Sequence, residues 1–324
     1  MKLTSPSTSN ENQLLDQALS LQQHGQYKEA EAVFRQLVGM RSRNPAVYLN
    51  YANLHYVCGR LQQAVATCKQ ALAIHPDIAD AHYNLAVFYV EQKKIKEAVA
   101  SLQAAIKADP QYAEAHFLLG MQQKALGQLN EAIASFRYVI ARNPQVWEAH
   151  FNLANTLAQA GQYLEAIEAY ERVLGMQGDH LEARFNLSNA LLNAGRTDEA
   201  IAGLQGIIAA HPDFHTAYIN LGNAYLAKRQ YAEAIQSYRT ALQHIADKPE
   251  ILLNLGTALK GSGDIAGAIE TYERLIKAHK NFKEAFDNLG NLYLSQGMHA
   301  KGLETIRKGS GFIRFRLGKG YATV

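Results

Sequence analysis

The sequence predicts an all-α solenoid of nine consecutive 34-residue repeats, each of which forms a helix–turn–helix hairpin. Three observations lead to this fold class. Residue types recur every 34 positions without insertion or deletion, small residues recur at two fixed places, and a glycine usually lies between them. A fixed period of about 20–50 residues is typical of solenoids, whose repeats bury their apolar faces against their neighbours. The predicted repeats span 11–44, 45–78, 79–112, 113–146, 147–180, 181–214, 215–248, 249–282 and 283–316.

Each part of the repeat has a physical reason. Small residues such as Ala154 at position 8 and Ala166 at position 20 allow the two helices of a hairpin to approach closely. Glycine at position 15 suits the end of a helix, where the backbone adopts a positive φ. Prolines such as Pro110 and Pro144 at position 32 close the second helix, because proline cannot continue it.

The ends of the chain depart from the pattern. Residues 1–10 are polar, and we expect a disordered leader there. In the eighth repeat, Gly261 and Gly263 predict that the first helix frays early, and Gly302 and Gly309 make the last repeat degenerate. Residues 312–317 favour an extended strand, and 317–324 form a basic, glycine-rich tail. This C-terminal segment could cover the last hairpin, begin a further domain or dock into another copy.

Small residues at positions 8 and 20, glycine at 15, an aromatic residue at 24 and proline at 32 together resemble the tetratricopeptide repeat (TPR) family. The resemblance implies a right-handed superhelix with a concave groove. It also implies that positions 2, 5, 6, 9, 12 and 13 of each first helix line that groove.

Composition limits the class of protein. The chain contains no apolar run long enough to cross a membrane and no secretory signal, so we expect a cytoplasmic protein without membrane contact. The net charge of +3 is concentrated in residues 301–324, and the repeats lack the basic surface typical of nucleic-acid binding. Cys58 and Cys68 are interpreted as reduced, small core residues.

The candidate binding residues begin with two rows of asparagine on the first helices. Asparagine is a mediocre helix former, but its amide offers two donors and an acceptor to the backbone of an extended peptide. The double row resembles the superhelix of O-linked N-acetylglucosamine transferases, which implies that position 6 grips polypeptide. Alternatively, these amides could bond the neighbouring hairpin and stabilise stacking. The rows are Asn50, Asn84, Asn152, Asn186, Asn220, Asn254 and Asn288 at position 6, and Asn53, Asn155, Asn189, Asn223 and Asn291 at position 9.

An aromatic row accompanies the asparagines at position 5. Its members are Tyr83, Phe117, Phe151 and Phe185, and Leu118 and Met121 interrupt the asparagine rows beside it. Clustered aromatic side chains on a surface mark interaction sites, although partial packing against the neighbouring hairpin could also explain them. Acidic residues at position 2 would favour a ligand with basic flanks.

No catalytic, cofactor or metal site is predicted. His82, His116 and His150 recur at position 4, but successive helices lie about 8–10 Å apart, too far for shared ligation of a metal. The sequence contains no nucleophile elbow, phosphate loop or zinc-protease motif.

These features predict a non-enzymatic scaffold that binds a protein or peptide in extended form. Two alternatives stay open at this point: the recognition arm of a larger, glycosyltransferase-like enzyme, and a module that self-associates through its uncapped C-terminal end.

Overall fold

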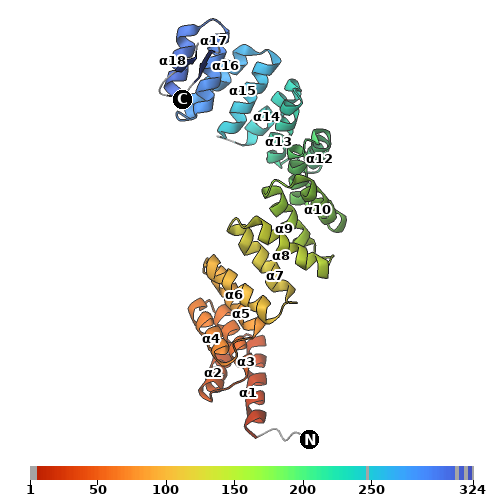
Figure 1. Cartoon of the computed structure of the whole chain (residues 1–324), viewed down its shortest axis with the longest axis vertical. Helices are drawn as coiled ribbons and strands as arrows, with labels where there is room; N and C mark the ends of the chain where they lie inside the picture. Colours follow the sequence, from red (N-terminus) through yellow and green to blue (C-terminus); the bar gives the residue numbers. More distant parts are fainter. Residues whose placement is uncertain (1–5, 246–247, 311–313, 317–319, 323–324) are drawn as a thin grey trace. The chain divides into compact units, whose positions relative to one another are not determined.

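The structure is a computed structural model that describes residues 6–245, 248–310, 314–316 and 320–322, with side chains from residue 10 to residue 310 apart from 246–247. In this part of the chain, 18 helices follow one another and a short β-hairpin comes after them (Figure 1). From the second repeat onward, every first helix begins at the residue where the sequence period places the start of a repeat. The predicted all-α class with nine helix pairs is therefore confirmed.

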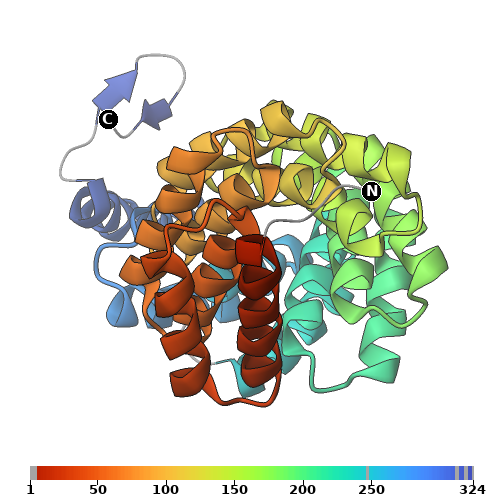
Figure 2. The same cartoon turned by 90° about the horizontal axis from the view of Figure 1, so that it is seen from below.

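The chain divides into two compact units, Met1–Gln162 and Tyr163–Val324, which we call the N-terminal unit and the C-terminal unit and describe separately. In the N-terminal unit, helices that are consecutive in sequence pack against each other, as the antiparallel pair at the start of the chain shows (Figure 2). Its helices are α1 Pro6–Gln23, α2 Tyr27–Gly39, α3 Pro45–Val57, α4 Leu61–Ile74, α5 Ala79–Glu91, α6 Ile95–Ala108, α7 Ala113–Ala125, α8 Leu129–Arg142 and α9 Trp147–Gln159.

The C-terminal unit repeats this arrangement and adds the hairpin, whose strands pair antiparallel with Phe315 opposite Tyr321. Its elements are α10 Tyr163–Met176, α11 Leu181–Asn193, α12 Thr197–Ala210, α13 His215–Ala227, α14 Tyr231–His244, α15 Pro249–Ser262, α16 Ile265–Ala278, α17 Lys283–Ser295, α18 His299–Ser310, β1 Arg314–Arg316 and β2 Gly320–Ala322.

The small residues at positions 8 and 20 bring the two helices of each hairpin together. Ala52 on α3 and Ala64 on α4 are fully buried, like most of their counterparts. Where position 8 of these repeats is glycine, the ring at position 24 fills the space that a side chain at position 8 would take. A Cβ on Gly120 would lie 2.9 Å from the Phe136 ring, and one on Gly256 would lie 2.5 Å from the Tyr272 ring. Positions 8 and 24 therefore contact each other, and in these two repeats the glycine leaves the space that the ring fills.

The turn inside each hairpin needs a left-handed residue at position 15. Seven glycines adopt φ between 74° and 88° there. Lys93 and Arg229 occupy the same position with φ of 58° and 57°, so two turns accept a conformation that side chains with a Cβ rarely adopt.

Three expectations about irregular segments need correction. Helix α1 begins at Pro6, so residues 6–10 of the expected leader are helical, and residues 1–5 lie outside the described residues. Helix α15 does not fray early but runs to Ser262, with Gly263 as its left-handed cap. A Cβ on Gly302 would lie 2.8 Å from the Gly290 carbonyl oxygen. Gly302 therefore permits a close approach of α17 and α18 and does not mark the end of regular packing.

Candidate binding surface on the first helices

In the C-terminal unit, asparagines of the two rows form hydrogen-bonded pairs. Asn254 on α15 donates from Nδ2 to Oδ1 of Asn223 on α13, at 3.0 Å, and Asn220 donates to Asn189 in the same way one repeat earlier. Position 6 of one repeat thus bonds position 9 of the preceding repeat. The stacking role that the sequence left open is present in this unit.

A buried tyrosine at position 24 adds a third member to the pair of Asn254 and Asn223. The hydroxyl of Tyr238, which is fully buried, donates to Oδ1 of Asn223 at 2.7 Å. Burial raises the pKa of this hydroxyl above its ordinary value, so it stays protonated and remains a donor. Tyr170 and Tyr272 lie in the same way beside Asn186 and Asn288, the position-6 residues of the repeats that follow them.

The N-terminal unit arranges the same residue type differently. Asn50 and Asn152 turn back to their own helices and donate to the carbonyls of Ala46 and Glu148, at 2.8 and 2.9 Å. Asn53 and Asn84 make no hydrogen bond to any residue that the structure describes. Position 9 of the preceding repeat is Leu19 before Asn50 and Met121 before Asn152, so neither amide has an asparagine to bond there.

The remaining members of the rows are accessible in part. Asn155 is half-buried on α9 and has an interaction partner, and Asn291 is exposed on α17. Every position-6 asparagine is half-buried. Because the amide of Asn220 uses one Nδ2 proton in its bond to Asn189, one N–H and the oxygen remain for a ligand.

We call five apolar side chains on the successive first helices α5, α7 and α9 the apolar patch: Tyr83, Phe117, Leu118, Met121 and Phe151. Met121 is 40% exposed and the other four are half-buried. Their rings pack partly within the unit: Tyr83 lies 5.1 Å from Tyr112, and Phe117 meets Phe136 edge-on at 5.8 Å. Partial packing and partial exposure are therefore both present. Phe185 belongs to the C-terminal unit, where its ring packs edge-on against Phe214.

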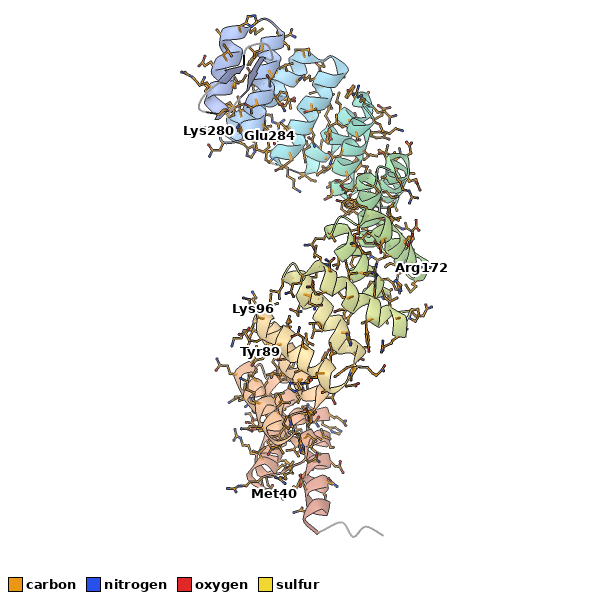
Figure 3. The ribbon with its side chains drawn as sticks, in the orientation of Figure 1. Met40, Tyr89, Lys96, Arg172, Lys280 and Glu284 are labelled. Carbon is orange, nitrogen blue, oxygen red and sulfur yellow. The ribbon has the colours of Figure 1, made fainter. Side chains whose placement is uncertain are left out.

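Acidic residues begin the helices that carry the apolar patch. Asp80, Glu114 and Glu148 lie in the first turns of α5, α7 and α9 and are exposed. Glu284 has the same place on α17 (Figure 3). Negative charge at a helix N-terminus is favourable in itself, and it also gives the edge of the patch a negative potential.

The histidines at position 4 have a structural role that the sequence did not reveal. Nε2 of His82, His116 and His150 donates to the carbonyl of the proline six residues earlier, at 2.8, 3.3 and 3.0 Å. Tyr48 and Arg184, at the same position, bond the equivalent carbonyls of Ser42 and Gly178. The side chain at position 4 therefore stabilises the turn between successive repeats by donating to its carbonyl. The sequence signal that could have revealed this role is a side chain with a polar end that recurs six residues after the turn residue.

The two cysteines differ from each other, which corrects the expectation that both are core residues. Cys68 is fully buried, and burial raises the pKa of its thiol to about 12. Cys58 is exposed at the end of α3. Among the described residues, no three His, Cys, Asp or Glu side chains come close enough to hold a metal ion, and no helix there combines the length and hydropathy needed to cross a bilayer.

Comparison with known proteins agrees with this architecture. A tetratricopeptide repeat family model matches residues 21–77, 59–121, 157–222 and 225–292, and a second model of the same repeat matches residues 117–180. No curated protein matches the chain.

Solved structures show the same fold. YrrB, described as a TPR protein with an unusual peptide-binding site, is 24% identical, covers 57% of this chain and 95% of its own, and has a TM-score of 0.54. The C-terminal part of a TPR repeat-containing protein from Cytophaga hutchinsonii is 15% identical, covers 74% and 99%, and has a TM-score of 0.61. A tetratricopeptide repeat protein from Parabacteroides merdae is 17% identical, covers 78% and 99%, and has a TM-score of 0.52. With the family models matching most of its length, the chain belongs to the tetratricopeptide repeat family.

Proposed function

We propose that this protein is an interaction scaffold whose first helices bind an extended polypeptide. The observation that carries the proposal is the apolar patch: five large side chains on three successive first helices stay partly exposed. Large aromatic and apolar side chains that remain accessible together are typical of interaction surfaces. YrrB, which shares the fold, is itself described as having a peptide-binding site.

The asparagines supply the second element of the proposal. Half-exposed amides that keep a free oxygen and a free N–H can pair with the peptide groups of a ligand in extended conformation. Such pairing does not depend on the ligand's sequence. In the C-terminal unit the same amides also join neighbouring repeats, so the two roles coexist there.

The charges at the edge of the patch define the ligand further. Asp80, Glu114 and Glu148 carry no ion pair within the described residues. A peptide with one or two apolar side chains and lysine or arginine beside them complements both the apolar centre and the acidic edge.

Fluorescence polarisation tests the proposal with a labelled peptide that carries two leucines flanked by lysines. Changing both Leu118 and Met121 to asparagine gives this repeat the residues found at positions 6 and 9 of other repeats. We expect about tenfold weaker binding, because the ligand loses contact with two apolar side chains. The matched control is Leu164→Asn, which removes an apolar side chain that is 66% exposed on the second helix α10. Equal affinity of the double variant and the unchanged protein would contradict the proposal.

A second comparison tests the asparagines. Substituting Asn152, Asn186 and Asn220 by alanine should weaken the same peptide by about threefold or more, since hydrogen bonds contribute about 0.5–1.5 kcal/mol each. Circular dichroism checks that helicity is retained. Unchanged affinity would assign these residues to stacking alone.

A further inference from the structure

A second accessible depression lies on different helix faces, between α12 and α14, with α13 as its floor. It has a volume of about 600 Å³. Ile208 and Ala209 line one wall, Tyr218 and Tyr225 the floor, and Gln236 and Thr240 the other wall. We call it the α12–α14 groove. None of the asparagines or the apolar patch belongs to it.

The same place in the N-terminal unit is occupied by a side chain of the protein itself. Tyr138 on α8 stacks on His116 of α7, with ring centroids 3.6 Å apart, and its hydroxyl donates to the carbonyl of Pro110. The guanidinium of Arg142, one helical turn further along α8, lies 3.5 Å from the centroid of the Tyr138 ring. Arg142 in turn donates to Oε1 of Gln111 at 3.0 Å. A tyrosine and a cation one turn apart thus fill this position between α6 and α8.

The α12–α14 groove has neither of these side chains. In the 34-residue period, Thr240 replaces Tyr138 and His244 replaces Arg142. His244 stacks on His215 instead, with ring centroids 4.0 Å apart. Pro212 corresponds to Pro110, but its carbonyl accepts no hydrogen bond from any residue that the structure describes. An aromatic floor and a free acceptor remain where the intramolecular tyrosine would lie.

The charges around the α12–α14 groove match the missing cation. Glu233 is the charged residue among those that line it, and no lysine or arginine lines it. Asp213, exposed at the turn before α13, stands where Gln111 receives Arg142. Asp213 therefore places a negative charge where the N-terminal unit has the neutral amide that receives its arginine, whereas Glu233 corresponds to Glu131 in that unit.

We propose that the α12–α14 groove is a second binding site, which takes a tyrosine ring from a partner protein with an arginine or lysine placed one helical turn away. The ring stacks on Tyr218, its hydroxyl donates to the carbonyl of Pro212, and the cation pairs with Asp213. Aromatic stacking and a cation beside an aromatic ring are both favourable contacts, and Tyr138 with Arg142 shows that this repeat geometry accommodates them. This site is independent of the surface on the first helices.

Disulfide trapping tests the proposal in the full-length protein. In a Cys58→Ser background, Gln236→Cys places a thiol at the wall of the α12–α14 groove. The variant is offered equal amounts of two disulfide-activated fragments that differ only in a phenol or an isobutyl group, and mass spectrometry measures which one it captures. We expect about fivefold preference for the phenol, because a stacked ring pair contributes beyond its buried area. Adding a guanidinium to the phenol fragment should increase capture relative to a carboxylate.

The period supplies matched controls. Ala134→Cys places the thiol at the same position of α8, where Tyr138 already fills the space, and should show no preference. Thr240→Tyr should remove the preference of the Gln236→Cys variant, because it supplies an intramolecular ring, and Tyr138→Thr should create one in the Ala134→Cys variant. Thermal unfolding confirms that each variant is folded. Equal capture of both fragments by the Gln236→Cys variant, or a preference that survives Thr240→Tyr, would overturn the proposal.

Discussion

The first helices of the two units carry the same asparagine at position 6 and use it in different ways. In the C-terminal unit, Asn254 bonds Asn223, and the buried hydroxyl of Tyr238 completes the network. In the N-terminal unit, where position 9 of the preceding repeat is Leu19 or Met121, Asn50 and Asn152 turn to their own helices. The role of a repeated residue therefore depends on its neighbours in the adjacent repeat, and sequence identity at one position does not define it.

The second difference is what the units expose. Position 9 is Val87 or Met121 on α5 and α7, where the C-terminal unit has Asn189 and Asn223 on α11 and α13. The N-terminal unit thus offers apolar contact at places where the C-terminal unit offers amides.

The largest effect should follow from breaking the network in the C-terminal unit. Asn223→Leu leaves the hydroxyl of Tyr238 buried without its acceptor, and an unsatisfied buried group costs about 1–3 kcal/mol. We expect the free energy of unfolding, measured with urea, to fall by about 2 kcal/mol. Adding Tyr238→Phe should restore part of the loss. Purely additive losses from the two substitutions would show that the bond contributes nothing.

The second largest loss of stability should follow from removing the hydrogen bond at the turn between repeats. His82→Phe removes the bond to the Pro76 carbonyl and should cost about 1 kcal/mol of stability. Tyr218, at the same position in the C-terminal unit, makes no hydrogen bond to a described residue, so Tyr218→Phe is the matched control and should cost little. Urea unfolding of both variants measures the difference, and equal losses would argue against the fastening role of position 4.

Glycine at position 15, in the turn inside the hairpin, should increase stability equally in both units. Lys93→Gly and Arg229→Gly replace side chains held at positive φ, and each should raise the free energy of unfolding by about 1 kcal/mol. Thermal unfolding measures both. As a control, Lys94→Gly changes the neighbouring residue, whose φ is −90°, and should lower stability. Lower stability of the Lys93→Gly and Arg229→Gly variants would mean that these side chains make contacts that outweigh the strain of their positive φ.

The smallest effect is the loss of stability at acidic pH that comes from two buried histidines. Burial lowers the pKa of His55 and of His116, both in the N-terminal unit, below the ordinary value of 6.5. The unfolded chain therefore binds protons more readily, so the stability from these two groups is present above pH 6.5 and is lost as the pH falls through their folded pKa values. His55→Phe should make the unfolding free energy less dependent on pH between about 7 and 5. An unchanged dependence would contradict this account.

Much of the fold could be predicted from the sequence because the residues that begin and end its helices act locally. Proline at position 32 and glycine at position 15 act through their own backbone, so the starts of α3 to α17 follow from the period alone. The continuation of α15 through Gly261 depends on packing. A Cβ on Gly261, for example, would lie 2.4 Å from the Tyr231 ring. No local signal carries that information.

The candidate site was predictable in part. Its rows of residues follow from the period, but the bond from Asn254 to Asn223 depends on a distance between repeats. The α12–α14 groove could not be foreseen, because Tyr138 is the one ring at its position in the nine repeats and nothing in the sequence distinguishes Thr240 from the other residues there. The recognition arm of a larger enzyme and self-association through the C-terminal end stay predictions.

The central claim is that the apolar patch binds peptide, and methionine methyl NMR tests it most directly. The chain has five methionines, of which Met121 lies in the patch and Met40 and Met298 lie exposed elsewhere. With methyl-labelled methionine, we expect the leucine–lysine peptide to shift the Met121 signal in a saturable way while the Met40 and Met298 signals stay in place. A Met121 signal that does not move at saturating peptide, or one that moves no more than the Met298 signal, would contradict the account.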